Sequence, residues 1–141
     1  MKIFLDTNVI LDVLVKREPF YIDSAKILTL VNEKIIPGYI SAITINNIYY
    51  ILSKLKNKDL ARNFIKEILE SFEIIPLTKI ILQRANTINI DDFEDAIQYF
   101  SALEYECAFL VTRNYKDYPE DKINNINNIK IMAPAELIKL L

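Results

Sequence analysis

The sequence predicts an α/β fold in which a parallel β-sheet is covered by helices on both faces, and three observations support this prediction. Short apolar segments that suit β-strands alternate with longer segments whose apolar residues recur at helical spacing. Residues 108–112 are apolar without alternation, which is typical of a strand buried on both faces. Polar residues follow several strands, at the edge where open α/β sheets bind their ligands.

The first strand is expected at residues 2–5, because its apolar residues stop at Asp6 and helical spacing begins directly afterwards, in a helix over residues 7–15. The other expected strands are residues 39–41, 73–77, 108–112 and 129–132, and the other expected helices are residues 21–33, 42–55, 59–72, 78–88, 91–106 and 134–141. We interpret residues 113–118 as a loop or a single helical turn and residues 124–128 as irregular. No repeat or linker interrupts this order, so we expect a single domain over residues 1–141.

Some expected helices show a clear apolar face. In the helix over residues 59–72, the spacing of the apolar residues predicts that Leu60, Phe64, Ile68 and Leu69 all point inward.

The composition excludes several classes of site. The chain has no histidine, which removes Ser-His and Cys-His nucleophiles and every His-ligated zinc site. The net charge of −2 argues against a strongly basic nucleic-acid-binding surface, so a polyanion would need a local basic patch or bound cations. Cys107 is the single cysteine, and we expect a buried small hydrophobe and a reducing, cytoplasmic location. No apolar run approaches the roughly 20 residues that span a membrane, so no membrane association is expected.

Acidic residues stand at three positions where the predicted sheet could bring them together. Asp6 ends the first strand, Asp95 lies in the acidic start of the helix at 91–106, and Asp117 follows the strand at 108–112. If the first and fourth strands are neighbours, these three carboxylates converge on one edge. Carboxylates that close together repel one another unless a cation neutralises them, and Mg²⁺ or Mn²⁺ is the natural occupant of such an oxygen-lined site.

Each of these acids also has an ordinary structural explanation. Asp6 could be the N-cap of the following helix, and the acids at 91–94 suit a helix N-terminus. Residues such as Asp117 are common in turns after strands. Asn46 and Asn47 are poor helix formers side by side, and the amide oxygen of either is a fair ligand for a hard cation.

Four segments in order resemble a PIN domain, in the style of the VapC-type toxins of prokaryotic toxin–antitoxin pairs. They are Ile3 to Asp12, Ile40 to Thr44, Asp92 to Ala96 and Val111 to Tyr118, and together they extend over almost the whole chain. The resemblance implies a Rossmann-like α/β/α sandwich with a five-stranded parallel sheet. It also implies Mg²⁺- or Mn²⁺-dependent endoribonuclease activity on RNA, and a homodimer that is inhibited by an antitoxin protein.

The resemblance assigns roles to individual residues. Asp6, Asp95 and Asp117 match acids that hold the metal and take part in catalysis, and Thr7, Asn8, Thr112 and Asn114 match polar residues near the metal. PIN nucleases usually carry a further acid in the helix after the second strand, where this chain has Asn47. We include Asn47 as a site residue and expect that the lost charge weakens metal binding and activity.

Other side chains receive weaker assignments. Arg17, Arg113 and Lys116 are candidates for contacts with RNA phosphates, although surface Lys and Arg usually only contact solvent. Asp12 is expected to form an ion pair with Arg17 or Lys16 rather than to face the site.

Two other classes of function fit less well. An aspartate-nucleophile phosphatase would need Asp-x-Asp after the first strand, where this chain has Asp6-Thr7-Asn8. A receiver domain would need an acid after the third strand, where Pro76, Leu77 and Thr78 stand. The serious alternative is a PIN fold that has lost activity through Asn47 and serves as an RNA-binding or protein-interaction module.

Overall fold

The computed structural model describes residues 1–118 and 129–141, apart from the side chain of Asp117. Its centre is a five-stranded sheet with the order β3-β2-β1-β4-β5. The strands are β1 (Ile3–Leu5), β2 (Gly38–Ser41), β3 (Glu73–Ile75), β4 (Phe109–Val111) and β5 (Lys130–Met132). All four neighbouring pairs are parallel. The sequence-based prediction of an α/β fold with a five-stranded parallel sheet is confirmed.

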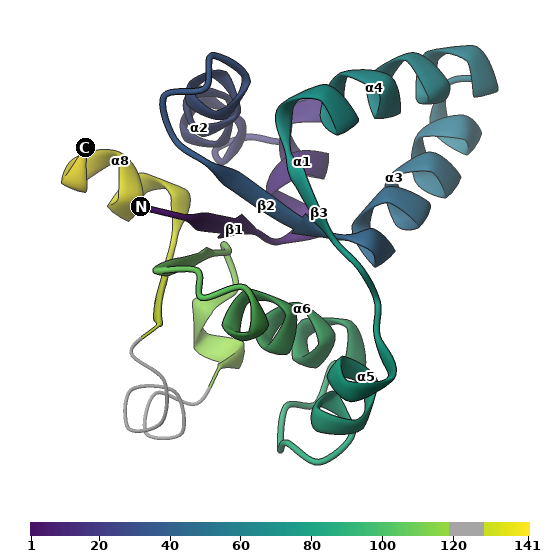
Figure 1. The fold of residues 1–141 in the computed structure, drawn as a ribbon. Helices are drawn as coiled ribbons and strands as arrows, with labels where there is room; N and C mark the ends of the chain where they lie inside the picture. The colour runs from purple at the N-terminus through teal and green to yellow at the C-terminus, as the bar shows by residue number, and fades with distance from the viewer. Residues whose placement is uncertain (119–128) are drawn as a thin grey trace.

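Helices cover both faces of this sheet, as Figure 1 shows. One face carries α1 (Thr7–Leu14), α2 (Tyr21–Asn32), α3 (Ala42–Leu55), α4 (Lys58–Ser71) and the C-terminal α8 (Pro134–Leu140), whereas the other carries α5 (Lys79–Ala85) and α6 (Phe93–Glu104). A 3₁₀ turn, η1 (Tyr115–Asp117), follows β4. None of the described helices is long and apolar enough to cross a membrane.

Each face of the sheet has its own apolar core. Ile3 and Leu5 pack into the core beneath α1 and α2, whereas Phe4, between them, packs with α5 and α6. This alternation follows from the two-residue period of a strand, which sends successive side chains to opposite faces. The central strand β1 is therefore buried on both sides, and its carboxyl end is held at a fixed place between the two helical layers.

The junction between β1 and α1 places Asp6 at the carboxyl edge of the sheet. The Asp6 backbone N–H donates to the Val111 carbonyl at 3.0 Å, which continues the pairing of β1 with β4. Its carboxylate accepts a hydrogen bond from the backbone N–H of Asn8, which caps the N-terminus of α1. β1 is flanked by β2 and β4, so α3 and α6, which adjoin these two strands, approach Asp6 from either side.

The structure corrects several details predicted from the sequence. The prediction that Leu60 and Leu69 point inward is wrong, since they are 45% and 53% exposed, whereas Ile68 is buried. The strand expected at 73–77 ends at Ile75, and the helix expected at 78–88 ends at Ala85.

Two remaining expectations concern Cys107 and the polar segment. Cys107 is buried, as expected, and this burial raises the pKa of its thiol to about 12. The irregular segment expected at 124–128 lies outside the described residues.

Candidate functional site

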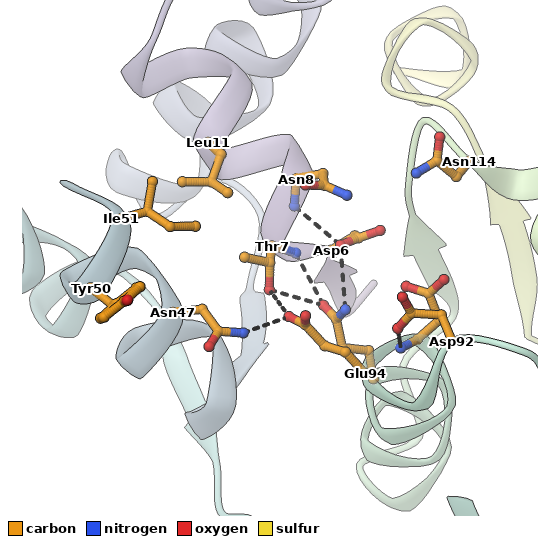
Figure 2. Close-up of a pocket in the computed structure, with 12 residues that line it drawn as sticks. Asp6, Thr7, Asn8, Leu11, Asn47, Tyr50, Ile51, Asp92, Glu94 and Asn114 are labelled. Carbon is orange, nitrogen blue, oxygen red and sulfur yellow. Dashed lines mark hydrogen bonds between the residues drawn. The ribbon is translucent and has the colours of Figure 1, made fainter. Parts of the chain in front are cut away.

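A polar pocket of about 430 Å³ opens at the carboxyl edge of the sheet, between α1, α3 and α6. Figure 2 shows its side chains converging from these three helices and from the turn after β4. The lining residues are Asp6, Thr7, Asn8, Leu11, Asn47, Tyr50, Ile51, Asp92, Glu94, Asp95, Gln98 and Asn114. Most of the residues predicted from the sequence to form the site are therefore found in one cavity.

Asp6 is the most deeply buried acid of this pocket, with only 1% of its surface exposed. Its Oδ2 accepts a hydrogen bond from Thr112 Oγ1 at 2.7 Å, and its Oδ1 accepts from Gln98 Nε2 at 3.3 Å and from the Asn8 backbone N–H at 3.1 Å. No Lys or Arg forms an ion pair with Asp6 in the described part of the chain. Its charge is thus held in place by neutral donors, and no described side chain supplies a balancing cation.

Thr7 connects Asp6 to the helices on either side. Its backbone N–H donates to Gln98 Oε1 at 3.0 Å. Its hydroxyl lies 2.7 Å from that of Thr44 and donates to Glu94 Oε1 at 3.0 Å. Because the Thr7 hydroxyl proton goes to Glu94, the Thr44 hydroxyl is the donor in the buried Thr7–Thr44 bond. Thr7 therefore joins α1 to both α3 and α6.

The acids of α6 differ in their roles. Asp92 caps the helix by accepting a hydrogen bond from the Asp95 backbone N–H at 3.0 Å. This leaves Asp95, one position past Glu94, to line the pocket together with Asp6. Asp117 lies in η1, just past β4, but its side chain is outside the described residues. The structure thus brings Asp6 and Asp95 to one pocket, whereas the place of the Asp117 carboxylate stays a prediction.

The smaller polar residues named in the resemblance lie at or next to this pocket. Asn8 and Asn114 line the pocket, and Thr112 stands behind it, where its hydroxyl donates to Asp6 and accepts from the Asn114 backbone N–H at 3.2 Å. Asn47 also lines this pocket, whereas its exposed neighbour Asn46 lines a different one. Of the two adjacent asparagines, Asn47 is therefore the one that lines the pocket of Asp6.

Two of the basic residues proposed to contact RNA are engaged elsewhere. Arg17 and Arg113 lie 3.2 and 3.4 Å from the carboxylate of Asp12, which is 1% exposed. Burial raises the pKa of Asp12, while Arg113 and Arg17 oppose that rise. The expected ion pair between Asp12 and Arg17 is present, and Lys116 remains exposed.

The donor set of the pocket fits a hard divalent cation. It offers carboxylate, amide and hydroxyl oxygens, with no sulfur or imidazole, and this is the set that Mg²⁺ and Mn²⁺ prefer. Such a cation would be stabilised by the buried carboxylate of Asp6, whose charge no described side chain balances. Within residues 1–118 and 129–141, the side chains as they stand form no cluster of three acids close enough to hold a metal. Metal binding would therefore involve a rearrangement of side chains or the carboxylate of Asp117.

Comparison with known protein families identifies the family of this chain. A family model described as PIN domain matches residues 2–116. The chain belongs to the PIN domain family. Ribonuclease VapC1 of Aquifex aeolicus (strain VF5) is 30% identical to this PIN domain over 125 residues, which are 85% of this chain and 86% of the relative.

Solved structures share the fold of this PIN domain. VapBC2 from Rickettsia felis, bound to a DNA fragment from its promoter, matches with a TM-score of 0.68 and 21% identity, covering 94% of this chain and 98% of the other. A toxin–antitoxin complex from Klebsiella pneumoniae matches with a TM-score of 0.66 and 23% identity, covering 93% and 96%. At these identities the likeness concerns the fold, which supports the five-stranded PIN architecture.

Glu94 and Gln98 are among the residues of this PIN domain's pocket that sequence reasoning missed. Glu94 was grouped with the acids that suit a helix N-terminus, and Gln98 was not considered. A signal was available, because Gln98 lies four residues after Glu94 and both therefore share one side of α6. A glutamine that is 1% exposed in a helix has to hydrogen-bond inside the protein, and here it holds Asp6 and Thr7.

Proposed function

We propose that this PIN domain is a divalent-metal-dependent endoribonuclease that acts as the toxin of a toxin–antitoxin pair. The observation that supports the proposal most strongly is the buried Asp6, whose charge has no cationic partner among the described residues, in a pocket lined by oxygen ligands. The similarity to a relative named a ribonuclease and to toxin–antitoxin complexes supports the substrate class and the antitoxin partner.

In this proposal, Asp6, Asp95 and Asp117 would hold Mg²⁺ or Mn²⁺. When bound, the metal supplies a Lewis acid for a phosphate oxygen and lowers the pKa of a water that attacks phosphorus. Thr112 and Gln98 hold the Asp6 carboxylate in one orientation, so that less order has to be gained when the metal binds. Asn8 and Asn114, at the same pocket, would offer amide groups that can donate to the phosphate of the RNA.

Contacts with RNA would come from the rim of the pocket. Tyr50 lines the pocket with a ring that is 58% exposed, and the Lys54 ammonium lies 4.3 Å from its centre. An exposed aromatic ring next to a cation suits a stacked base and its phosphate. Lys116 is the remaining exposed candidate for a phosphate contact, since Arg17 and Arg113 pair with Asp12. A homodimer completes the proposal, by resemblance to the VapC-type toxins.

The test is cleavage of a structured RNA by the purified protein in Mn²⁺, with EDTA and with Asp6→Asn. EDTA should stop cleavage, and Asp6→Asn should slow it by about a hundredfold or more, the scale expected when a charge-stabilising group is lost. Cleavage that persists in both conditions would rule out this site. A folded protein that binds Mn²⁺ but never cleaves RNA would instead favour the non-catalytic module.

A further inference from the structure

Glu94 approaches Asn47 across the pocket, although the two residues are far apart in the sequence. Asn47 Nδ2 donates to Glu94 Oε1 at 2.9 Å, and Thr7 Oγ1 donates to the same oxygen at 3.0 Å. Figure 2 shows the Glu94 side chain reaching from α6 toward Asn47 on α3, with the Thr7 hydroxyl beside it. The carboxylate of Glu94 thus lies next to the position where the family pattern places an acid.

The polarity of these contacts fixes the role of each partner. An ionised carboxylate only accepts hydrogen bonds, so the Asn47 amide has to turn its NH₂ group toward Glu94. Thr7 can donate to Glu94 because its own oxygen accepts from Thr44, which is fully buried. An acid at position 47 could not donate in this way, and it would repel Glu94. The asparagine and the glutamate are therefore complementary to each other.

No described cation balances the charge of Glu94. None of the ion pairs among the described residues includes it, and the donors to Oε1 are a neutral amide and a neutral hydroxyl. Its Oε2 accepts no hydrogen bond from a described residue. Glu94 lines the same pocket as Asp6 and Asp95, so its free acceptor capacity belongs to that cavity.

We propose that Glu94 supplies the carboxylate that Asn47 lacks, so that the metal site keeps its full negative charge with one acid moved from α3 to α6. Asn47 is then a positioning residue that acts through Glu94. This inference rests on the proposed function, since it concerns the same metal site. It removes the reason to expect a weak nuclease, because the charge missing at position 47 is present at position 94.

Titration calorimetry with Mn²⁺ alone, on the full chain, measures metal binding and tests the proposal without requiring activity. Glu94→Gln should weaken Mn²⁺ binding by about tenfold or more, the loss seen when groups around a metal are removed. Asp91→Asn is the matched control, because Asp91 belongs to the same acidic segment but does not line the pocket. It should change the affinity less than about twofold, since an exposed charge is screened by solvent and salt.

A second test moves the carboxylate from position 94 on α6 to position 47 on α3. Asn47→Glu combined with Glu94→Gln places the carboxylate on α3 and the amide on α6, and it should restore Mn²⁺ affinity to within about threefold of the parent, because the net charge of the pocket is the same. If the exchanged variant folds like the parent but recovers no Mn²⁺ affinity, the carboxylate does not act through its charge in this pocket, and this result would overturn the proposal.

A double-mutant cycle tests the positioning role of Asn47. Asn47→Ala should weaken Mn²⁺ binding in the parent by about threefold but should have no further effect when Glu94 is already Gln. Equal losses in both backgrounds would show that Asn47 acts independently of Glu94, against the proposal.

Asp6→Asn separates this inference from the proposed function. Loss of Mn²⁺ binding in Asp6→Asn with none in Glu94→Gln would refute the role of Glu94 and leave the metal site intact. Unchanged binding in Asp6→Asn would refute the metal site itself.

Discussion

Asn47 and Glu94 illustrate how one polar contact sets the effect of a substitution. Asn47→Asp would replace the amide donor, 2.9 Å from Glu94 Oε1, with a second carboxylate. In EDTA the two charges should repel by about 1 kcal/mol or more, which lowers Tm by a few degrees in a chain of this size. Mn²⁺ should relieve the repulsion, so the rise in Tm on adding the metal should exceed that of the parent. Thermal unfolding with and without Mn²⁺ measures both effects.

Asn46→Asp is the matched control for this prediction. Asn46 is exposed and lines a different pocket, so an acid there should leave both Tm and its response to Mn²⁺ close to the parent values. If the two variants behaved alike, the contact between Asn47 and Glu94 would have no part in metal binding. The sequence alone supported a simpler expectation, that Asn47→Asp restores a missing charge, because it gave no sign that Glu94 faces Asn47.

At the scale of elements, Gly38 determines how closely α2 and α4 approach the sheet. A Cβ at this position would lie 2.6 Å from Val31 Cγ1 and 2.9 Å from Phe72 Cε1. Gly38→Ala should therefore lower the free energy of unfolding by about 1–3 kcal/mol, the usual cost of overpacking a core. Urea unfolding followed by circular dichroism measures the change. Because Gly38 lies away from the pocket, Mn²⁺ affinity should not change.

A second substitution tests the cause of that loss. Val31→Ala removes the methyl groups that the new Cβ would meet, so the loss in Gly38→Ala/Val31→Ala should be smaller than the sum of the single losses. A strictly additive pair would mean that the strain arises from other contacts, such as the one with Phe72.

The elements show which parts of the fold the sequence could predict. Strand and helix order followed from apolar patterning, because each strand and each helical stripe carries its own period. The face of α4 that points into the core did not follow from this patterning. The buried residues are Ala61 and Ile68, and their sequence neighbours Leu60 and Leu69 are exposed. Residues next to each other on a helix differ by about 100° around its axis, so a small rotation exchanges buried and exposed positions. That rotation is set by packing on α3, which local spacing does not encode.

The candidate site was predictable to a similar extent. Asp6 and Asp95 could be proposed because the chain order and the parallel sheet determine which strand ends and helix starts meet. The spacing of Glu94 and Gln98 places them on one side of α6, but only the fold shows that this side faces Asp6, Thr7 and Asn47. The sequence predicted an ion pair of Asp12 with Arg17 or Lys16, whereas only the fold shows that Arg113 also reaches Asp12.

At the scale of the whole molecule, the net charge of the chain and the acids of its pocket predict how RNA binding depends on divalent cations. The chain carries a net charge of −2, and its pocket is lined by Asp6, Asp92, Glu94 and Asp95. A phosphate backbone should be repelled from this cavity until divalent cations occupy it. Arg17 and Arg113 offset little of that repulsion because they pair with Asp12.

RNA affinity should therefore rise on adding Mn²⁺ at constant ionic strength, by about tenfold, as expected when one or two charges at a phosphate-binding site are reversed. Fluorescence anisotropy of a labelled RNA, with its integrity checked on a gel, measures the affinity in EDTA and in Mn²⁺. Asp6→Asn should lose the increase, because it weakens the metal site while removing one negative charge from the pocket. If the negative charge of the pocket repelled RNA and the bound metal played no part, Asp6→Asn would instead bind RNA more tightly than the parent, both in EDTA and in Mn²⁺. Tight binding of the parent in EDTA would show that RNA docks on a surface outside this pocket.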